Sequence, residues 1–326
     1  MTSLLVRVTK KSIAAQDIAS FELAALDGQV LPGFDAGAHI DVHVPGADGA
    51  TLLRQYSLCN APGERGHYRI AVLREAASRG GSAGMHELVG EGDQIRISTP
   101  RNHFSLQPAV ASRAILLFAG GIGITPILCM AQALSGAGRE FALHYCARSM
   151  RHLAFHDEIL ASPYAGSVHF HLDDGVPEQR LDIVAILAAS SVDTPIYVCG
   201  PKGYIDFVIA SARAAGWDDG NIVREYFGLP AAVARDAEAS FEVEVASSGA
   251  RYTVPPGRSI IAVLADGGVE IPVSCEQGVC GTCITRVLAG EPDHRDLYFN
   301  DAEHALNDQM TPCCSRSRGP LLVLDL

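Results

Sequence analysis

The sequence predicts an antiparallel β-barrel, then an α/β domain with a parallel sheet, then a small β-rich domain at the C-terminus. Three observations predict this fold class. The length of 326 residues is about twice that of a usual single domain. Apolar residues change from short alternating runs to a strand-then-helix rhythm near residue 108, and cysteines gather in the last quarter. We therefore expect domains at 1–107, 108–228 and 238–326, with an Ala-rich linker at 229–237.

The first predicted domain is all β. Apolar or alternating runs at 40–44, 68–73 and 94–98 are separated by clusters of Pro and Gly, a pattern typical of antiparallel strands and their turns. A barrel is the natural closure of such a sheet.

Two segments of this domain carry groups suited to a flat, phosphorylated ligand. The first contains Arg54, Tyr56 and Ser57. A cation can bind phosphate, an aromatic ring can cover a flat ring, and a hydroxyl can hydrogen-bond a ring nitrogen. The second contains Gly80, Gly81 and Ser82, ahead of a predicted helix at 83–88. The start of a helix can bind phosphate. The alternatives are a plain strand for the first segment and a capped helix start without a ligand for the second.

The second domain alternates strands with helices, which implies βαβ units and a parallel sheet. Strands are expected at 114–119, 141–146, 168–172 and 196–199, and helices at 126–134 and 204–215. Ligands of such sheets bind at the carboxyl ends of the strands.

Two turns are expected to meet at that carboxyl edge. The first, between a strand and a helix, contains Gly121, Ile122, Gly123 and Thr125. The second follows a later strand and contains Cys199, Gly200 and Pro201. Glycine lets the backbone approach a pyrophosphate, and the helix start offers unpaired N–H groups. A simple turn, and a Cys199 that is only a small buried side chain, are the alternatives.

The third domain contains the strongest motif of the chain. A predicted hairpin at 241–254, a short helix capped by Ser259 and a last strand at 321–324 surround it. The motif has the spacing C-x4-C-x2-C and a further cysteine after twenty-nine residues, at Cys275, Cys280, Cys283 and Cys313. This is the spacing of plant-type [2Fe-2S] sites. Zinc sites favour paired C-x2-C knuckles, and only one such pair is present. Spacing alone leaves Cys313 and Cys314 open as the fourth ligand.

Composition excludes several functional classes. A net charge of −12 argues against a nucleic-acid partner, which requires clustered Lys and Arg. Residues 114–134 carry no charge, but their Gly and Pro fit a strand, turn and helix better than a membrane span. Nine cysteines and an N-terminus without a signal-peptide core predict a cytoplasmic protein with reduced thiols.

The sequence, with its motifs in this order, resembles the phthalate dioxygenase reductase family, which includes vanillate demethylase reductases. The resemblance covers nearly the whole chain and implies FMN, NADH and a [2Fe-2S] cluster, a flavin-binding barrel and a β-grasp ferredoxin domain. It implies that Arg54 binds the flavin phosphate and that Ser57 lies near flavin N5. Cys199 would face the nicotinamide, Phe227 would shield the flavin, and Cys313 would be the fourth cluster ligand.

The resemblance also implies the activity. Hydride from NADH would reduce the flavin, which would pass single electrons through the cluster to a Rieske-type oxygenase. A reductase for a cytochrome P450 or another acceptor and a non-enzymatic redox sensor are the alternatives. The electron-transfer subunit of a dihydroorotate dehydrogenase is disfavoured, because we expect a shorter gap before its fourth cysteine. Arg148 and Arg151 can accept the 2′-phosphate of NADPH, but Asp173 and Asp174 disfavour it, so NADH is expected.

Charge also points to the third domain as a docking surface. Residues 238–326 contain thirteen Asp or Glu and six Lys or Arg, a net charge of −7. Such asymmetry can steer an electron acceptor of opposite local charge, although solubility alone also explains it. Glu276, Asp293 and Asp296 are the acidic residues that we expect on this surface.

Overall fold

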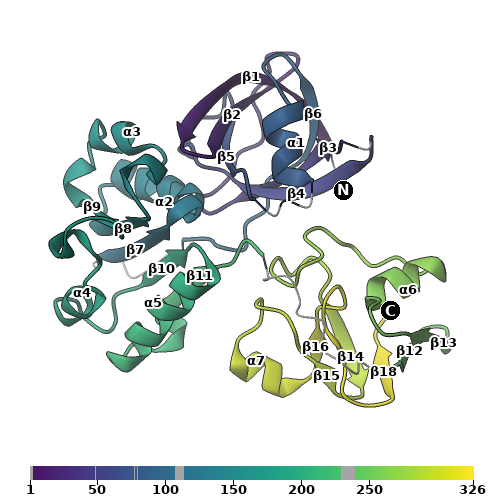
Figure 1. Cartoon of the computed structure of the whole chain (residues 1–326). Helices are drawn as coiled ribbons and strands as arrows, with labels where there is room; N and C mark the ends of the chain where they lie inside the picture. The colour runs from purple at the N-terminus through teal and green to yellow at the C-terminus, as the bar shows by residue number, and fades with distance from the viewer. Residues whose placement is uncertain (1–2, 48, 77, 79, 107–113, 229–238) are drawn as a thin grey trace. The chain divides into compact units, whose positions relative to one another are not determined.

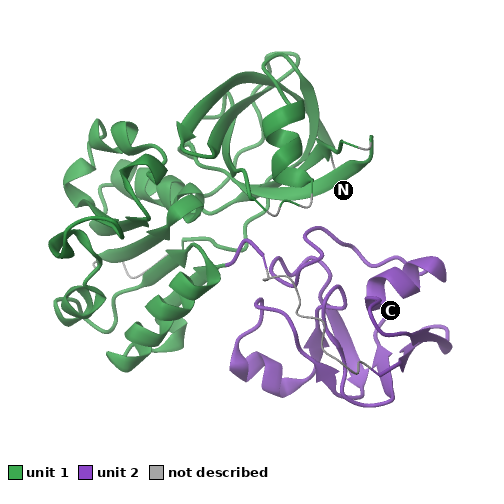
Figure 2. Ribbon diagram, in the orientation of Figure 1, with its two compact units in different colours: residues 1–225 green, residues 226–326 purple. Residues whose placement is uncertain are grey.

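The computed structural model describes residues 3–47, 49–76, 78, 80–106, 114–228 and 239–326. Its contacts divide the chain into two compact units, Met1–Glu225 (unit 1) and Tyr226–Leu326 (unit 2), as Figure 2 shows. The predicted boundary at residues 107 and 108 and the predicted linker at 229–237 lie outside the described residues. The predicted fold class is confirmed, with an antiparallel sheet, a parallel sheet and a small C-terminal β-rich fold along the chain (Figure 1).

The first sheet of unit 1 is a six-stranded antiparallel barrel in the order β4-β3-β6-β1-β2-β5. Its strands are β1 (Ser3–Ala15), β2 (Ile18–Ala25), β3 (His39–Pro45), β4 (Thr51–Ser57), β5 (Tyr68–Leu73) and β6 (Gln94–Ser98). A bridge between Leu58 and Ile70 joins the end of β4 to β5, which closes the sheet. Helix α1 (Gly81–Leu88) packs against β3, β4 and β5.

The second sheet of unit 1 is parallel and has the order β11-β10-β7-β8-β9. Its strands are β7 (Ile115–Gly120), β8 (Phe141–Ala147), β9 (Val168–Leu172), β10 (Ile196–Cys199) and β11 (Ile222–Glu225). Its helices are α2 (Ile124–Gly136), α3 (His156–Leu160), α4 (Ile183–Ala188) and α5 (Lys202–Ala214). In Figure 1, α2 lies on one face of this sheet and α4 and α5 on the other.

The strand order of the parallel sheet fixes where a ligand can bind. The chain runs from β7 outward through β8 and β9, and then returns to place β10 on the other side of β7. The order therefore reverses between β7 and β10, and in open α/β sheets the ligand crevice lies at the carboxyl ends of the two strands at that reversal.

The barrel and the parallel sheet of unit 1 share one continuous apolar core. The ring of Phe104 meets that of Tyr197 edge-on, with centroids 5.9 Å apart. Arg69 of the barrel pairs with Glu158 at 2.7 Å and lies over the ring of Phe155. These contacts explain why both sheets belong to a single unit.

Unit 2 is built on a five-stranded sheet in the order β13-β12-β18-β14-β16. Ser259 caps α6 by accepting from the Ala262 N–H, as the sequence predicts. The elements of the unit are β12 (Phe241–Val245), β13 (Ala250–Val254), α6 (Ile260–Asp266), β14 (Thr285–Ala289), β15 (Pro292–Asp293), α7 (Asp301–Leu306), β16 (Gln309–Met310), β17 (Arg316–Ser317) and β18 (Leu321–Leu324).

A buried arginine fastens the start of unit 2 to its cysteine-bearing end. Arg316 is 5% exposed and donates to the carbonyl oxygens of Arg258, Ala239 and Pro255. Its guanidinium also lies over the ring of Phe241 at 4.9 Å. The cation is thus satisfied by backbone acceptors and an aromatic face, as burial of a charge requires.

The uncharged stretch at 114–134 is strand, turn and helix, as predicted. It comprises β7, a 3₁₀ turn at Gly121–Gly123 and most of α2. Across the described parts of the chain, no helix combines the length and the apolar character needed to cross a membrane.

Candidate functional site

The two predicted turns of the nucleotide site pack directly against each other at the carboxyl edge of β7 and β10. A Cβ on Gly123 would lie 2.3 Å from the carbonyl oxygen of Cys199, and one on Gly200 would lie 3.0 Å from Cα of Gly120. Only glycine fits at position 123, because a Cβ there would overlap the Cys199 backbone, and a Cβ at position 200 would be unusually tight against Gly120. The structure therefore brings the glycine-rich turn and the Cys-Gly-Pro turn together where the strand order reverses.

The remaining residues of these turns shape the backbone. Gly121 adopts φ 53°, in the left-handed region that favours glycine. Thr125 is 2% exposed, and its hydroxyl donates to the carbonyl of Ile122 at 3.0 Å. Pro201 is the N-cap of α5. Thr125 and Pro201 thus position the turn and the helix starts that face the crevice.

Ser57, Glu225 and Cys199 form a cluster in unit 1. The Ser57 hydroxyl donates to Glu225 Oε2 at 3.5 Å, which links the end of β4 to the end of β11. Cys199 and Glu225 are register partners on β10 and β11. Burial raises the pKa of Glu225 to about 8, and the Ser57 hydrogen bond opposes this rise. The edge of the parallel sheet thus holds a carboxyl group that titrates near neutral pH beside a hydroxyl of the barrel.

Cys199 lies in the interior. Its side chain has no exposed surface, and burial, followed by the charge of Glu225, raises the pKa of its thiol well above the usual value. A neutral, enclosed thiol is not a nucleophile. Sequence reasoning assigned a role to Cys199 but none to Glu225, and the short strand Ile222–Glu225, which ends in Arg224 and Glu225, carries no clear signal for it.

Arg54 and the second phosphate loop are brought together. A Cβ on Gly81 would lie 2.3 Å from Nε of Arg54, so the guanidinium stem crosses the start of α1. Gly80, the N-cap of α1, has φ 86° and leaves the first turn without a side-chain cap. A cation over an uncapped helix start is an arrangement that favours a phosphate.

Tyr56 and Ser82 are the other two predicted ligand-binding residues of the barrel domain. Burial raises the pKa of Tyr56, so its phenol stays protonated. The Ser82 hydroxyl donates to Ser78 Oγ at 3.0 Å and accepts from the Glu75 N–H. Ser82 therefore closes the loop ahead of α1 through its own hydrogen bonds.

The four predicted ligand cysteines of unit 2 come together in two pairs. Cys275 lies against Cys280, and Cys283 lies against Cys313. Hydrogen bonding within the pairs lowers the pKa of Cys280 and of Cys283. The same hydrogen bonds raise the pKa of their partners, Cys275 and Cys313. Two thiols to each of two irons is the ligand set that a [2Fe-2S] cluster requires. The Gln277 N–H points at Cys275 Sγ at 3.3 Å, as the amides around such clusters do.

Left-handed backbone shapes the loop that carries three of these thiols. Glu276, Gly278 and Gly281 have φ of 53°, 66° and 70°. A Cβ on Gly278 would lie 2.4 Å from Cys314 Sγ, and one on Gly281 would lie 2.4 Å from the Tyr298 ring. Both glycines are required by conformation and by space, so the donor set and its loop fit an iron–sulfur cluster.

Cys314 lies against Cys313 and also contacts two hydroxyl groups. Its sulfur lies 3.3 Å from Thr311 Oγ1 and 3.9 Å from Ser315 Oγ. It also contacts Cys313 closely enough to lower its own pKa. Cys313, which also hydrogen-bonds Cys283, stays the predicted fourth ligand.

The structure buries one of the predicted functional residues of unit 2, Asp296, and exposes another, Phe227. Asp296 was expected on a docking surface, and this was wrong: its side chain is fully buried and accepts from the Tyr298 and Phe299 N–H groups. An aspartate that satisfies the backbone two and three residues later turns inward, which charge counting cannot detect. Phe227, at the start of unit 2, is 42% exposed.

Comparison with known proteins decides the family. The chain is 51% identical to the vanillate O-demethylase oxidoreductase of Pseudomonas putida over 320 residues, which covers 98% of both chains. It is 39% identical to the phthalate dioxygenase reductase of Burkholderia cepacia, over 99% of this chain and 97% of the other. The chain belongs to the phthalate dioxygenase reductase family. This member is an oxidoreductase with a flavin-binding domain and a [2Fe-2S] domain.

Domain models and solved structures agree with that membership. Residues 5–106 match the oxidoreductase FAD-binding domain, and residues 243–318 match the 2Fe-2S iron-sulfur cluster binding domain. A solved phthalate dioxygenase reductase is similar over 99% of this chain and 98% of the other, with a TM-score of 0.75 and 38% identity. An intact type IV self-sufficient cytochrome P450 monooxygenase is similar over 99% of this chain but only 41% of its own, with a TM-score of 0.84 and 34% identity.

Proposed function

We propose that this reductase takes electrons from NADH through FMN to its [2Fe-2S] cluster and delivers them to a Rieske-type oxygenase. The pairing of Cys275 with Cys280 and of Cys283 with Cys313 carries the proposal, because it supplies a one-electron centre in the same chain as a flavin-binding barrel. Relatives that are similar over nearly the whole chain include a vanillate O-demethylase oxidoreductase and a phthalate dioxygenase reductase.

The flavin site is proposed on the barrel residues that lie near the parallel sheet. Arg54 and the start of α1, with Gly80, Gly81 and Ser82, would hold the phosphate of FMN. Tyr56 would lie on the flat ring system, and the Ser57 hydroxyl would hydrogen-bond near N5. A bound flavin supplies hydride acceptance and release of single electrons. Phe227, just after Glu225, is the aromatic that we propose to cover it.

The nicotinamide site is proposed at the crevice between β7 and β10. The turn Gly121–Gly123 would cradle the pyrophosphate, with Ile122 and Thr125 shaping it, and Gly200 and Pro201 would form the opposite wall. Cys199 ends the strand that enters this crevice, so we propose it as the neighbour of the nicotinamide. Glu225 would hold or release a proton at its carboxyl while Ser57 orients it.

The choice of NADH rests on the loops after β8 and β9. Asp173 and Asp174 are exposed, and their N–H groups donate to the carbonyls of Ala147 and Arg148. Two carboxylates beside the β8 end repel a 2′-phosphate and can accept from a ribose hydroxyl. Arg148 and Arg151 are also exposed and are the residues through which NADPH would be accepted.

Titration of the purified reductase with each nucleotide tests this preference. The rate of flavin bleaching under anaerobic conditions is compared for NADH and NADPH at equal concentration. We expect NADH to react faster by at least about tenfold, the equivalent of about 1.4 kcal/mol. Replacing Asp173 and Asp174 by Asn should lower the ratio of the rate with NADH to the rate with NADPH. A faster reaction with NADPH in the native protein would contradict the proposal.

The identity of the electron acceptor is the remaining question, because a self-sufficient cytochrome P450 monooxygenase contains a region similar to this chain. We expect the NADH-reduced protein to reduce a Rieske-type oxygenase faster than a stand-alone P450. Stopped-flow absorbance of the two acceptors measures this directly. Comparable rates with both, or faster reduction of the P450, would favour the alternative. Steady NADH oxidation with cytochrome c as acceptor separates either reductase from a redox sensor without catalysis.

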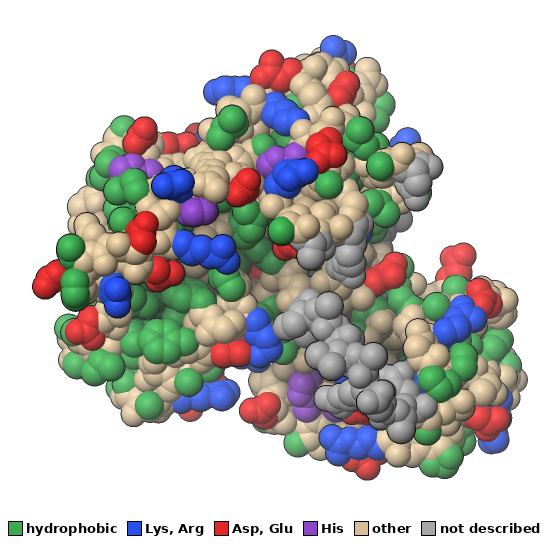
Figure 3. Space-filling view, viewed as in Figure 1, with side chains coloured by type: hydrophobic (Ala, Val, Ile, Leu, Met, Phe, Trp, Pro, Cys, Tyr) green, Lys and Arg blue, Asp and Glu red, His purple; other side chains and the backbone are tan. Residues whose placement is uncertain are grey.

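The docking surface is proposed on unit 2 near the cluster loop. Glu276 is exposed directly after Cys275, whereas Asp293 is half-buried and pairs with Arg295 at 2.7 Å. On the face drawn in Figure 3, red and blue side chains are interspersed, so the excess negative charge is not gathered in one large patch there. We expect Glu276→Gln to weaken the salt dependence of acceptor reduction and to leave flavin reduction unchanged.

A further inference from the structure

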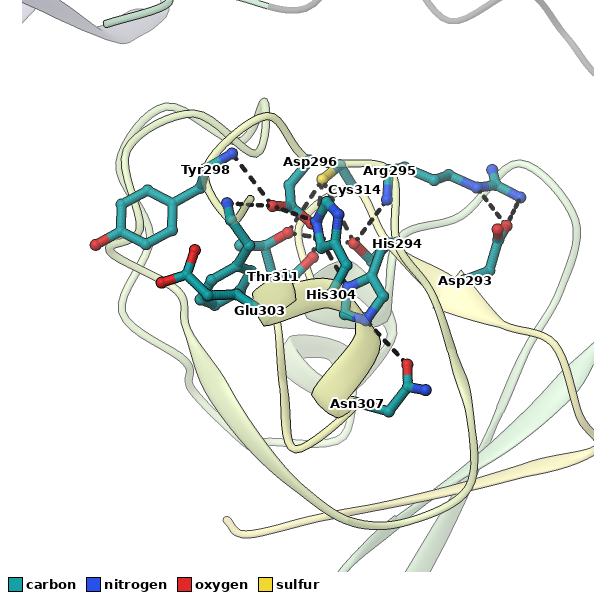
Figure 4. A network of polar contacts seen from close by, with 12 residues as sticks. Asp293, His294, Arg295, Asp296, Tyr298, Glu303, His304, Asn307, Thr311 and Cys314 are labelled. Atoms are coloured by element: carbon teal, nitrogen blue, oxygen red, sulfur yellow. Dashed lines mark hydrogen bonds and ion pairs between the residues drawn. The ribbon is translucent and has the colours of Figure 1, made fainter. Parts of the chain in front are cut away.

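We propose that His294, Asp296 and His304 of unit 2 form a binding site for one Zn²⁺ ion, separate from the cysteines of the cluster loop. One donor atom from each residue lies within 4.8 Å of the others. Figure 4 shows both imidazole rings close to the Asp296 carboxylate. The site is not used in the electron path proposed above.

The distances from the two histidines to Asp296 fit a small ion. His304 Nε2 lies 3.2 Å from both oxygens of Asp296, and His294 Nδ1 lies 3.8 Å from Asp296 Oδ1. Ligands about 2.0–2.2 Å from a tetrahedral zinc are about 3.3–3.6 Å apart. The separations to the carboxylate therefore require shifts of only a few tenths of an ångström for binding.

His294 supplies the observation that points to a ligand. Its side chain is only 7% exposed, and Nδ1 is buried with no hydrogen-bond partner among the described residues. Its other ring nitrogen, Nε2, lies 3.2 Å from the amide oxygen of Asn307. Because an amide oxygen only accepts, Nε2 is the donor of this hydrogen bond, and the tautomer with its proton on Nε2 has a lone pair on Nδ1. That lone pair faces a carboxylate, an arrangement that a cation between them would satisfy.

The outer contacts hold the three groups in place, as they do in known metal sites. Asp296 Oδ2 accepts from the Tyr298 and Phe299 N–H groups at 3.2 and 2.9 Å. His304 is set by helix α7, whose start is fixed by a capping box between Asn300 and Glu303. Two imidazoles and a carboxylate leave one tetrahedral position for water, a donor set that suits zinc better than the oxygen ligands preferred by calcium or magnesium.

The site lies against the cluster loop. A Cβ on Gly278 would be 2.9 Å from Cβ of Asp296, so the metal-binding aspartate packs on the left-handed backbone between Cys275 and Cys280. An ion held by His294 and His304 would clamp residues 294–304 over this loop. Zinc would then slow loss of the iron–sulfur cluster.

The test uses the full-length protein with its cofactors bound and the cluster absorbance monitored throughout. The protein is freed of loosely bound metal with a mild chelator and titrated calorimetrically with Zn²⁺. We expect one saturable site per chain. His304→Gln removes one of the three proposed ligands, so it should weaken binding by at least the roughly tenfold that loss of an outer contact costs. Asp301→Asn, which removes an exposed carboxylate from the same helix, should bind as the native protein does.

A second variant keeps the test decisive if a ligand replacement disturbs folding. Asn307 has φ 53°, so Asn307→Gly keeps the left-handed conformation while removing the acceptor for His294 Nε2. We expect weaker Zn²⁺ binding by about tenfold and an unchanged cluster spectrum. Absence of saturable binding in the native protein, or equal affinity in native, His304→Gln and Asn307→Gly proteins, would overturn the proposal.

Discussion

The sheet edge of unit 1 and the cysteine loop of unit 2 position their groups in different ways. At the sheet edge, Ser57, Cys199 and Glu225 are the last residues of β4, β10 and β11, so regular strand pairing places them. In the loop, Cys275 and Cys280 lie on irregular backbone with left-handed residues between them. A paired strand keeps its geometry through its own hydrogen bonds, whereas a loop of this kind depends on what its thiols bind.

The difference predicts unequal dependence on cofactors. Unit 1 should keep its site when the flavin is absent, because the core shared by the barrel and the parallel sheet holds the strand ends. Unit 2 has a smaller core, and its loop should lose order when the cluster is lost. Four changes test the contrast, beginning with the one of largest expected effect.

Cys283→Ser should abolish cluster assembly and electron delivery to the acceptor, because one of the four paired thiols is removed. Flavin reduction by NADH should stay within about twofold of native, a change of less than about 0.5 kcal/mol in barrier. Visible absorbance and stopped-flow kinetics measure both. The control is Cys314→Ser, which should keep the cluster. Retention of the cluster in Cys313→Ser with loss in Cys314→Ser would reverse the ligand assignment.

Gly123→Ala should disrupt the sheet edge through packing. Its new Cβ would lie 2.3 Å from the Cys199 carbonyl, so one turn must move, at a cost of about 3 kcal/mol. Gly121→Ala is the matched control, since nothing lies within 4 Å and only its positive φ is strained, at about 1 kcal/mol. Chemical denaturation should rank Gly123→Ala as the less stable. The reverse order would refute rigid contact between the turns.

Arg54→Ala should weaken flavin retention without unfolding the barrel. Losing a charge-assisted hydrogen bond to phosphate costs about 1.5–3 kcal/mol, or about ten- to 150-fold in affinity. Flavin release measured by fluorescence gives the dissociation constant. Arg96→Ala is the control, because it removes an exposed arginine of β6 whose guanidinium donates to the Ser3 hydroxyl. Equal affinities in the two variants would exclude a phosphate role for Arg54.

Glu225→Gln should change how stability varies with pH. The folded pKa of about 8 lies above the ordinary 4.5, so the folded protein binds more protons between these values. Stability contributed by this group is therefore greatest below pH 4.5 and declines as pH rises to about 8. Unfolding curves at about pH 5.5 and about pH 8.5 should show a smaller decline in Glu225→Gln than in native protein. Identical pH dependence would place the carboxyl at its ordinary pKa.

The sequence predicted the parts of the molecule that local pattern determines. The apolar runs at 68–73, 94–98, 168–172, 196–199 and 321–324 are strands with those bounds. Strand β1 was missed because only Val6 and Val8 are buried along it, so it lacks a clear alternation. Cysteine spacing identified the thiols because three of the ligands lie within one short stretch, from Cys275 to Cys283.

Tertiary contacts determine what the sequence did not reveal. The Ser57–Glu225 hydrogen bond joins residues 168 positions apart, and no local pattern encodes that pairing. Asp296 looked like one of several surface acids until its backbone partners were known. Such residues differ from other residues of the same type because contacts with distant parts of the sequence bury them.

The anchoring of Arg316 sets where unit 2 can be cut from the chain. Its guanidinium reaches back seventy-seven positions to the Ala239 carbonyl and lies over Phe241. The match to the cluster-binding domain starts at residue 243, and a fragment beginning at Val243 would lack both contacts. The buried guanidinium of Arg316 would then have fewer hydrogen-bond acceptors. Truncation ahead of Ala239 keeps them, so a free-standing electron carrier excised from this reductase should begin there.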